Sequence, residues 1–364
     1  MADQVALESP FVARVDIDRL TDFCVRAMGA VGMNDAGAHI TTNALVRTDQ
    51  RGIYTHGTVS LRRYVQLMRD GGINPAAVPE CITEGPAWAQ IDARQSVGMV
   101  AGHKGMETAI AKAKVCGIGM ACVRYSNHFG AASAYTLMAL DQTMIGMAMS
   151  NTDVVMSIPG GRGAQIGNNP MSYAVPAKTQ PPMVLDIAMS TVAGGKVMSA
   201  KNLGKPIPDG WLTDGEGLPS TDPNVFTTIG ALTPFGGHKG YGLALMVESL
   251  AGVLAGAGMT TDIPTWAKES KVACNEGHTF IAIDVGALMP VDQFLARMDE
   301  LIGRMRTAPK ATGATRTYIP GEMEYDCEAL ARAHGVALTE TAINNLKGLA
   351  EDTGLRDHCP LFDL

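Results

Sequence analysis

Residues 159–170 read Pro159-Gly160-Gly161-Arg162-Gly163-Ala164-Gln165-Ile166-Gly167-Asn168-Asn169-Pro170, and this glycine-rich loop decides which nucleotide-binding folds are open to the chain. The dinucleotide fingerprint G-x-G-x-x-G requires a glycine where the chain has Ile166, and no strand of the right kind leads into the loop. The P-loop spacing G-x-x-x-x-G-K-[ST] is also missing around Lys196 and Lys239. We therefore expect no ordinary Rossmann domain, although other glycine loops and helix N-termini expose backbone N–H groups that can bind a nucleotide.

Strands and helices alternate on both sides of this loop. Short apolar or alternating segments predict strands, and the helical period predicts a helix at 103–115. The predicted strands are 119–125, 144–150, 183–188 and 279–285. This alternation is typical of an α/β or α+β fold.

Both ends of the chain have the helical period instead. Near the N-terminus we predict helices from Ile17 to Val31, from a cap at Asp35 toward Arg51, and from Thr58 to Gly71. Near the C-terminus the period returns from Phe294 to Met305 and from Cys327 to Asp352.

These helical ends are expected to pack together as one domain around a sheet-containing domain. With 364 residues the chain is long enough for two domains. The predicted division places residues 1–80 with 325–364 in the helical domain and residues 81–324 in the α/β domain.

Composition excludes several classes of function. A net charge of -7 argues against a nucleic-acid-binding face, which needs clustered Lys and Arg. The seven cysteines are scattered without a C-x-x-C pair, and the histidines lack i, i+4 partners, so we expect no disulfide framework and no metal site.

The N-terminus lacks the apolar stretch of a signal peptide, and the apolar run Leu243–Met259 contains Glu248, which predicts a buried helix rather than a membrane span. A cytoplasmic protein is the simplest expectation.

Two histidines are candidates for proton transfer. His56 follows Thr55 and precedes Gly57, just before a predicted helix N-terminus, which also attracts an anion such as a carboxylate. His128 follows a predicted strand and precedes small residues that could begin a helix. Each has a plain structural alternative: a turn residue bonded to the backbone for His56, and a polar residue at a strand end for His128.

A third candidate is the turn Phe235-Gly236-Gly237-His238-Lys239-Gly240-Tyr241-Gly242. Its glycines would let phosphate groups approach the backbone, and Lys239 could pair with them. The alternative is a helix-packing turn with a solvated lysine.

Taken in order, the motifs resemble the malate/L-lactate dehydrogenase family, which includes sulfolactate, ureidoglycolate and diketogulonate oxidoreductases. The resemblance runs from about residue 15 to about residue 330. Its motifs are Arg51-Gly52 with Thr55-His56-Gly57, Gly71-Gly72-Ile73-Asn74-Pro75, Ser126-Asn127-His128-Phe129-Gly130, Gly167-Asn168-Asn169-Pro170, Asp186-Ile187-Ala188, Gly195-Lys196-Val197, Gly204-Lys205-Pro206-Ile207-Pro208, Lys239-Gly240-Tyr241-Gly242 and Pro320-Gly321-Glu322.

The resemblance implies a non-Rossmann nicotinamide-binding fold with a mixed sheet, using NAD or NADP, in a homodimer whose subunits share active sites. It implies oxidation of a small 2-hydroxy acid or reduction of a 2-oxo or cyclic imino acid. His56 and His128 are then the proton-handling positions, Thr55 stands where the family usually has serine, and Thr152 lies near the substrate. Cofactor contacts carry over to Phe129, Gly130, Ala131, Asn169, Asp186, Ile187, Ala188, Lys196, His238, Lys239, Gly240, Gly321 and Glu322.

One position departs from the pattern. Many relatives have an arginine four residues after the first histidine, suited to gripping a carboxylate, whereas this chain has Ser60. Arg51, Arg62 or Arg63, or the helix N-terminus at Thr58, are the possible replacements. Two alternatives to hydroxy-acid oxidation therefore stay open: a cyclic imino acid reductase, and a catalytically inactive ligand-binding homologue.

Overall fold

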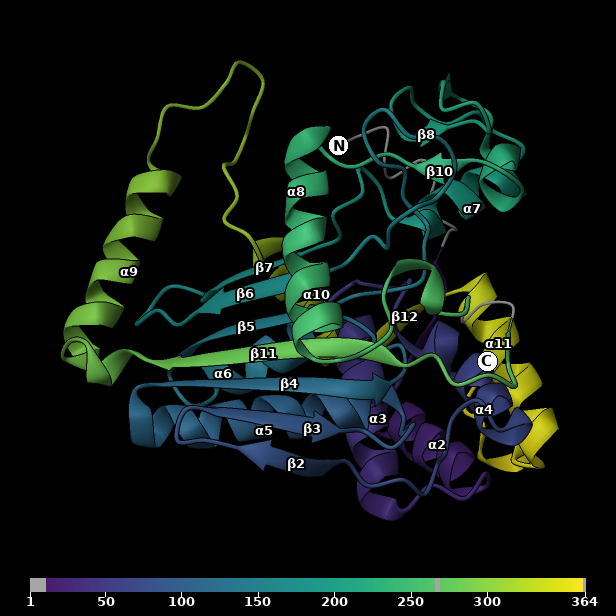
Figure 1. Cartoon of the computed structure of the whole chain (residues 1–364), viewed down its shortest axis with the longest axis horizontal. Coiled ribbons are helices and arrows are strands. Elements are labelled where there is room, and N and C mark those ends of the chain that lie inside the picture. The colour runs from purple at the N-terminus through teal and green to yellow at the C-terminus, as the bar shows by residue number, and fades with distance from the viewer. Residues whose placement is uncertain (1–10, 266–268, 363–364) are drawn as a thin grey trace.

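A seven-stranded mixed sheet in the order β2-β3-β4-β11-β5-β6-β7 forms the centre of the protein (Figure 1). The computed structural model describes residues 11–265 and 269–362. The β3–β4 pair is parallel and every other neighbouring pair is antiparallel. A Rossmann sheet is built from parallel strands, so this topology confirms that the fold is not of that kind. The sheet strands are β2 (Glu80–Glu84), β3 (Trp88–Asp92), β4 (Ile118–Ser126), β5 (Met144–Ser150), β6 (Met171–Val175), β7 (Met183–Ile187) and β11 (Glu276–Asp284).

Helices α5 (Gly98–Cys116) and α6 (Ser133–Leu140) pack against one face of the sheet. Glycines on α5 permit this packing, because a Cβ atom at Gly105 would overlap the ring of Phe280 on β11. Phe280 and Tyr135 are completely buried between the helices and the strands. Helix α8 (His238–Val247) continues as the π-helix η3 (Glu248–Leu254), and η3 contacts strands β4, β5 and β11. In Figure 1, α8 crosses in front of the sheet and α5 lies behind it.

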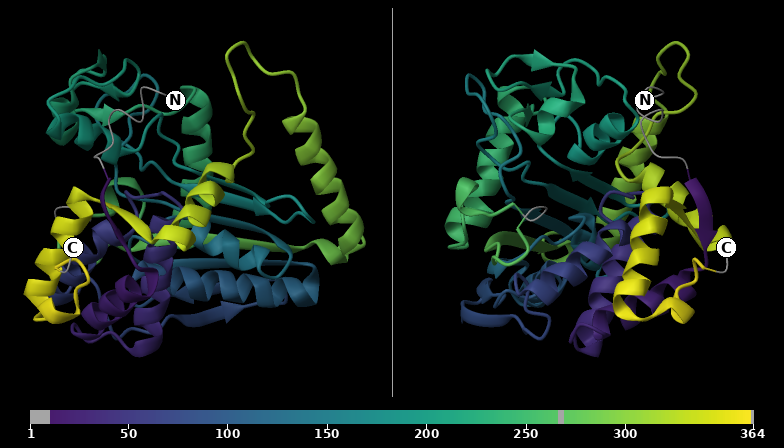
Figure 2. Two further views of the ribbon diagram at one scale, coloured as in Figure 1. Left: turned by 180° about the vertical axis from the view of Figure 1, so that it is seen from behind. Right: turned by 90° about the vertical axis from the view of Figure 1, so that its right-hand side faces the viewer.

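The two chain ends pack side by side, as both views of Figure 2 show. Strand β1 (Phe11–Val15) pairs antiparallel with β12 (Val336–Thr339), and one hydrophobic core contains residues from both ends. The remaining elements of this region are α2 (Ile17–Gly29), α3 (Asp35–Gln50), η1 (Thr58–Ser60), α4 (Leu61–Asp70), α10 (Glu322–His334), α11 (Glu340–Thr353) and η6 (Arg356–His358). The predicted helical assembly of the chain ends is therefore confirmed.

The exact division into two domains stays a prediction. Val97 and Met99, which fall in the predicted α/β domain, are buried in the same core as the chain ends. The first turn of α5 thus packs on the helical region, while the rest of the helix packs on the sheet.

A smaller three-stranded sheet lies beside the main one, at the upper right of Figure 1. Its core includes Trp211, Leu212 and Leu232, together with Val197 of the adjacent helix. The elements are α7 (Gly194–Asn202), β8 (Leu212–Thr213), β9 (Pro219–Ser220), η2 (Pro223–Thr227) and β10 (Ala231–Leu232).

The predicted strands and most of the predicted helices match observed elements, with corrections at their ends. The helical stretch predicted from Cys327 to Asp352 is divided by strand β12 into α10 and α11. The helix predicted at 103–115 begins at Gly98, and the strand predicted at 279–285 begins at Glu276. Asn34, not Asp35, caps α3, because its side chain accepts a hydrogen bond from the Gly37 N–H. Between α8 and β11 lies η4 (Thr260–Asp262), and after β11 lie η5 (Val285–Ala287) and α9 (Val291–Arg306).

The apolar run Leu243–Met259, predicted as a buried helix, is only partly buried. Its first part is α8 and its second part is η3, and Val253 and Leu254 are 60% and 56% exposed. Within the described residues, no helix is long and apolar enough to cross a membrane.

Candidate active site

The loop that carries His56 is held by a buried carboxylate. Oδ2 of Asp49, on α3, accepts hydrogen bonds from the Thr58 N–H at 2.8 Å and the Thr58 hydroxyl at 2.6 Å. Gly57 packs directly on this carboxylate, where a Cβ atom would overlap it. Burial raises the pKa of Asp49 to about 7, and the bonds from Thr58 oppose the rise. Asp49 thus fixes the turn before α4, and this turn carries His56.

The loop that carries His128 follows β4 and rests on the first residue of α5. A Cβ atom at Gly98 would overlap the carbonyl oxygens of Asn127 and His128. The Asn127 side chain donates a hydrogen bond to the Ser96 carbonyl at 2.9 Å, which ties this loop to the segment before α5. Strand β4 and helix α5 therefore set the position of His128 together.

The structure brings the two predicted histidines face to face. Their ring centroids are 5.6 Å apart and the rings are inclined by only 26°. Nδ1 of His56 is 2.8 Å from the Thr55 hydroxyl, and Nδ1 of His128 is 2.5 Å from the hydroxyl of Tyr64 on α4. Each imidazole thus has a hydroxyl partner on the same ring atom.

Both imidazoles are neutral at neutral pH. Burial lowers the pKa of His56. Burial lowers the pKa of His128 to about 3, and the proximity of His56 and His278 adds to this. His278 lies completely buried on β11, with its ring nitrogens 2.8 Å from the Ser150 hydroxyl and 2.7 Å from the Ser126 hydroxyl.

Three of the predicted cofactor residues, Phe129, Gly130 and Ala131, follow His128 in the sequence and lead into α6. Phe129 is buried, stacks on His278 with ring centroids 4.6 Å apart, and accepts a hydrogen bond from Tyr135 through its carbonyl. Gly130 has a positive φ of 75°, which turns the chain into Ala131 and α6. The first N–H of α6, from Ser133, donates to Asp186 at 2.8 Å, so the β4 and β7 ends meet here.

Asp186, Ile187 and Ala188 stand at the end of β7 and are half-buried. Burial raises the pKa of Asp186, and the bonds from Ser133 and the nearby charge of Arg51 oppose the rise. Just beyond them, the Met189 carbonyl accepts a hydrogen bond from the Phe235 N–H at 3.0 Å. This bond joins the end of β7 to the glycine turn before α8.

The turn before α8 leaves His238 and Lys239 exposed, with Gly240 buried beneath them. Gly236 and Gly237 have φ values of 57° and 63°, a conformation that side chains with a Cβ rarely adopt. The α8 N-terminus has no side-chain cap, and the N–H groups of Lys239 and Gly240 donate to the carbonyl groups of Gly236 and Phe235 in the preceding turn.

Helix α7 approaches the histidine loop from the small sheet. A Cβ atom at Gly195 would lie 3.0 Å from the Thr55 methyl group, which places Lys196 one residue away from the site. Gly321 and Glu322 lie further off, at the start of α10: a Cβ atom at Gly321 would be 3.1 Å from Val184 on β7. Although burial favours the neutral acid, the Ile319 N–H and the Arg306 guanidinium hold the pKa of Glu322 below its ordinary value.

The predicted substrate-binding residues are dispersed. Arg51 is buried, forms an ion pair with Glu328 at 3.1 Å, and lies over the Tyr325 ring at 4.7 Å. Ser60 is half-buried at the start of α4 and makes no capping bond. Arg63 is half-buried and donates to Gln66 at 3.3 Å.

Arg62 and the loop residues Thr152 and Asn169 have protein partners. Arg62 binds Asp352 of α11 at 2.7 Å. Thr152 is buried, and its hydroxyl donates to the Asn168 side chain at 3.2 Å. Asn169 is completely buried, accepting from the Thr152 N–H and donating to Glu248 at 2.8 Å. Asn169 thus ties the glycine-rich loop to η3.

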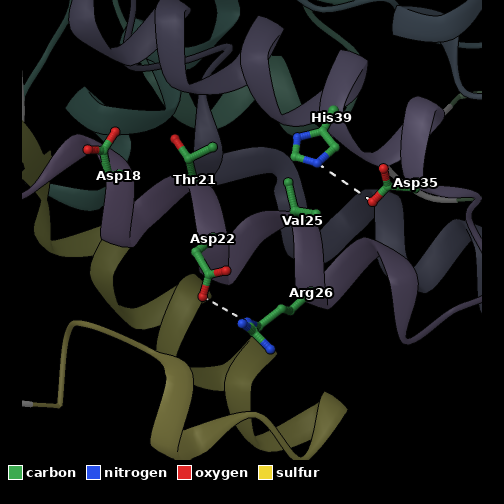
Figure 3. A pocket seen from close by; sticks show the side chains of 7 residues that line it. All are labelled: Asp18, Thr21, Asp22, Val25, Arg26, Asp35 and His39. Atoms are coloured by element: carbon green, nitrogen blue, oxygen red, sulfur yellow. Dashed lines mark hydrogen bonds and ion pairs between the residues drawn. The ribbon is translucent and has the colours of Figure 1, made fainter.

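Two surface pockets lie outside this constellation. The first, of about 430 Å³, is between α2 and α3 and contains the ion pairs Arg26–Asp22 and His39–Asp35 (Figure 3). The second, of about 340 Å³, is lined partly by Tyr325 and Glu328, the partners of Arg51. None of the predicted site residues lines either pocket. In the described part of the chain, no group of three or more His, Cys, Asp or Glu side chains could hold a metal ion.

Tyr64 and Asp49 are site residues that the sequence did not single out. Tyr64 lies within the predicted helix from Thr58 to Gly71 and is fully buried on the apolar face of α4. A tyrosine in an otherwise aliphatic helix face is a usable signal, because a buried phenol needs a hydrogen-bond partner. Asp49 carries no local signal, since its partner Thr58 lies outside α3.

The fold and the site define a class: a mixed α/β protein outside the Rossmann group, with two stacked histidines at the junction of its sheet and its helical chain ends. The malate/L-lactate dehydrogenase family model matches residues 15–347. The chain belongs to this family, and the resemblance inferred from its motifs is confirmed.

Individual relatives are similar in sequence to this chain over nearly its full length. Malate dehydrogenase of Pyrococcus horikoshii is 35% identical over 353 residues, covering 94% of this chain and 96% of that protein. L-sulfolactate dehydrogenase of Methanocaldococcus jannaschii is 35% identical over 324 residues, covering 89% and 92%. The crystal structure of malate dehydrogenase from Entamoeba histolytica superimposes with a TM-score of 0.89 at 31% identity, covering 94% of this chain and 98% of that one.

Proposed function

We propose that the protein transfers a hydride between a nicotinamide cofactor and C2 of a small 2-hydroxy or 2-oxo acid, and that His56 and His128 handle the proton. The observation that carries the proposal is the stacked pair of neutral imidazoles, each with Nδ1 engaged by a hydroxyl group. With Nδ1 engaged, Nε2 is the ring atom that exchanges a proton with the substrate oxygen. Relatives named malate and sulfolactate dehydrogenases support this reaction class.

The described residues fit a nicotinamide dinucleotide. Its phosphates need a close approach to the chain and a positive charge, which the two positive-φ glycines before α8 and the exposed Lys239 offer. We propose that the residues predicted to contact the cofactor, of which Phe129 is the first and Glu322 the last in the sequence, line the rest of the cofactor-binding site. When bound, the nicotinamide supplies a hydride donor or acceptor at carbon.

Both NAD and NADP are candidates. A relative from Escherichia coli is named ureidoglycolate dehydrogenase (NAD(+)), and one from Chromohalobacter salexigens is named (2R)-3-sulfolactate dehydrogenase (NADP(+)). The family therefore supports either cofactor for this chain.

Arg63 is our proposed anchor for the substrate carboxylate, because it is half-buried on α4, the helix whose Tyr64 contacts His128. Ser60 and Thr152 are proposed as further substrate contacts. Arg63 lies near the buried Cys274, whose pKa its charge affects.

The discriminating experiment is a panel of acids assayed with each cofactor. We expect NAD(H)- or NADP(H)-dependent turnover of malate, lactate or sulfolactate, or of their 2-oxo partners, followed by the absorbance of the reduced nicotinamide. Faster reduction of a pyrroline or piperideine carboxylate would select the alternative that a Pseudomonas putida relative, 29% identical and so named, favours. Thermal stabilisation by cofactor without any turnover would identify an inactive homologue instead.

A homodimer belongs to the same proposal. Apolar side chains at the junction of α8 and η3 are exposed in the single chain, namely Leu245, Met246, Val253 and Leu254. Light scattering is expected to give a mass of about twice the 38.3 kDa of one chain, and a mass of one chain would contradict the dimer. A cytoplasmic location is proposed from the scattered cysteines alone, and cell fractionation tests it.

A further inference from the structure

Glu248 is a buried acid to which the proposed reaction gives no role. It lies at the end of α8, where η3 begins, and is 5% exposed. Its Oε1 atom accepts hydrogen bonds from the Asn151 side chain at 3.2 Å and from the Thr260 N–H at 3.0 Å, and its Oε2 atom accepts one from the Asn169 side chain at 2.8 Å. All three donors are neutral groups. A carboxylate at this depth is costly unless hydrogen bonds replace its water, so we ask what these bonds hold in place.

Two of the three donors belong to residues with an unusual backbone conformation. Asn169 has a φ of 35° and Thr260 has a φ of 46°, both in the left-handed region that favours glycine. Asparagine tolerates this region better than threonine, whose β-branched side chain makes it a clear outlier there. Such conformations persist only where the surrounding contacts determine them, and the Glu248 carboxylate makes such a contact with both residues.

Asn169 connects the carboxylate to Thr152. The side-chain oxygen of Asn169 accepts a hydrogen bond from the Thr152 N–H at 3.2 Å, and its side-chain nitrogen also donates to the Ala244 carbonyl of α8 at 3.0 Å. Gly167 packs on the other side of Thr152, where a Cβ atom would lie 2.5 Å from both the hydroxyl and the carbonyl oxygen of Thr152. Thr152 therefore has little room to move.

Asn151, the residue before Thr152, is bound to the same carboxylate. Besides its bond to Glu248, the Asn151 side chain donates to the Gly258 carbonyl at 2.8 Å and accepts from the Gly277 N–H at 2.9 Å. The backbone at Thr152 is thus held both through its neighbour in the chain and through its own N–H. Both connections end on the two oxygens of one side chain.

We propose that Glu248 is a positioning residue that holds Thr152 in place to bind the substrate acid. This inference rests on the proposed function, which makes Thr152 a substrate contact. Glu248 acts through Asn151 and Asn169 and not on the acid itself. Because it stands at the end of α8, it also connects this substrate contact to the helix that follows the proposed phosphate-binding turn.

Glu248→Gln tests the role with a change that preserves the shape of the side chain. A carboxylate only accepts hydrogen bonds, whereas the glutamine amide turns an N–H group toward one of the donors that now bind it. At saturating cofactor, KM for the acid should rise about 10-fold, because Thr152 shifts and one substrate contact weakens. The effect on kcat should be much smaller, since His128 is held by Gly98 and Tyr64 instead.

Glu328→Gln is the matched control, because Glu328 is also 5% exposed but forms an ion pair with Arg51 at 3.1 Å. Removal of its charge leaves a buried guanidinium without its partner. This variant should lose at least as much thermal stability as Glu248→Gln and yet keep the wild-type KM for the acid. An equal rise of KM in the two variants, or an unchanged KM in Glu248→Gln, overturns the positioning role.

A compensating pair of substitutions gives a sharper readout. Asn169→Asp alone places a second carboxylate beside Glu248 and should also raise KM. In the double variant Glu248→Gln with Asn169→Asp, the glutamine amide can donate to the new carboxylate, which still accepts the Thr152 N–H. KM should therefore fall below that of either single variant, and a double variant no better than both contradicts the role.

Crystal structures of the unliganded wild type and of Glu248→Gln supply a readout that needs no turnover. In the variant, Thr152 should be displaced and Thr260 should leave its left-handed conformation. An unmoved Thr152 beside an active wild type overturns the positioning role alone. A wild type that turns over no acid overturns the proposed function, and the positioning role with it.

Discussion

Replacing His128 by alanine is expected to lower kcat by about 10²–10⁴-fold, the usual contribution of a general acid or base. The residue is held by the end of β4, contacts the Tyr64 hydroxyl at 2.5 Å and stacks on His56. Its removal deletes both the proton acceptor and the link from the substrate to Tyr64. The free energy of cofactor binding should change less than the barrier to turnover, because the cofactor phosphates are proposed to bind at the α8 turn and not at this imidazole. Steady-state kinetics and a cofactor-induced thermal shift measure the two effects separately.

The matched control is His39→Ala, which removes an exposed histidine paired only with Asp35 at 3.6 Å. This variant should keep wild-type kcat. His56→Ala is expected to reduce kcat too, and the comparison of the two variants shows which ring is the acid/base. Wild-type turnover in both His56→Ala and His128→Ala would refute the assignment of the site.

Gly98→Ala is expected to destabilise the protein and to inactivate it, although the change adds only one methyl group. Gly98 has a normal helical position at the start of α5, so the backbone itself tolerates alanine. The new Cβ atom would overlap the carbonyl oxygens of Asn127 and His128, and both are backbone atoms that cannot rotate away. We expect a loss of about 1–3 kcal/mol in the free energy of unfolding from overpacking. The forced displacement of His128 should cost about 10²-fold in kcat, the order expected for a misplacement of about 1 Å.

Gly303→Ala provides the control for Gly98→Ala. Gly303 lies in α9, where an added Cβ atom meets nothing within 4 Å. Alanine is the better helix former by about 1 kcal/mol, so this variant should be slightly more stable and fully active. Urea unfolding and kcat are measured on both variants. Equal free energies of unfolding and equal kcat values for Gly98→Ala and Gly303→Ala would contradict the packing of the His128 loop on α5.

Helices and central strands could be predicted from the sequence because their signals are local. The apolar face of α2, with Leu20, Cys24 and Met28, repeats with the helical period and is buried as expected. Strands β1 and β12 carried no such signal, since each has five residues or fewer and pairs with a partner at the other end of the chain. The exposure of Val253 was equally hidden, because an apolar sequence does not reveal what covers it.

The candidate site was only partly visible in the sequence. His56 and His128 each fit a structural role as well as a chemical one, and only the ordered family motifs linked two residues so far apart in the chain. The fold adds Tyr64 of α4, which contacts His128, and Asp49 of α3, which holds the His56 loop through Thr58. These residues and the two histidine loops come from separate elements, so no spacing along the chain could have brought them together.

The central claim is hydride transfer at C2 beside the histidine pair, and isotope transfer tests it most directly. The acid that turns over fastest in the panel is labelled with deuterium at C2, and the reduced cofactor is analysed by mass spectrometry. Direct hydride transfer predicts that the label appears in the nicotinamide ring and that His128→Ala slows its appearance in parallel with kcat. Turnover that releases the label to solvent, or leaves it in the product, would contradict this account.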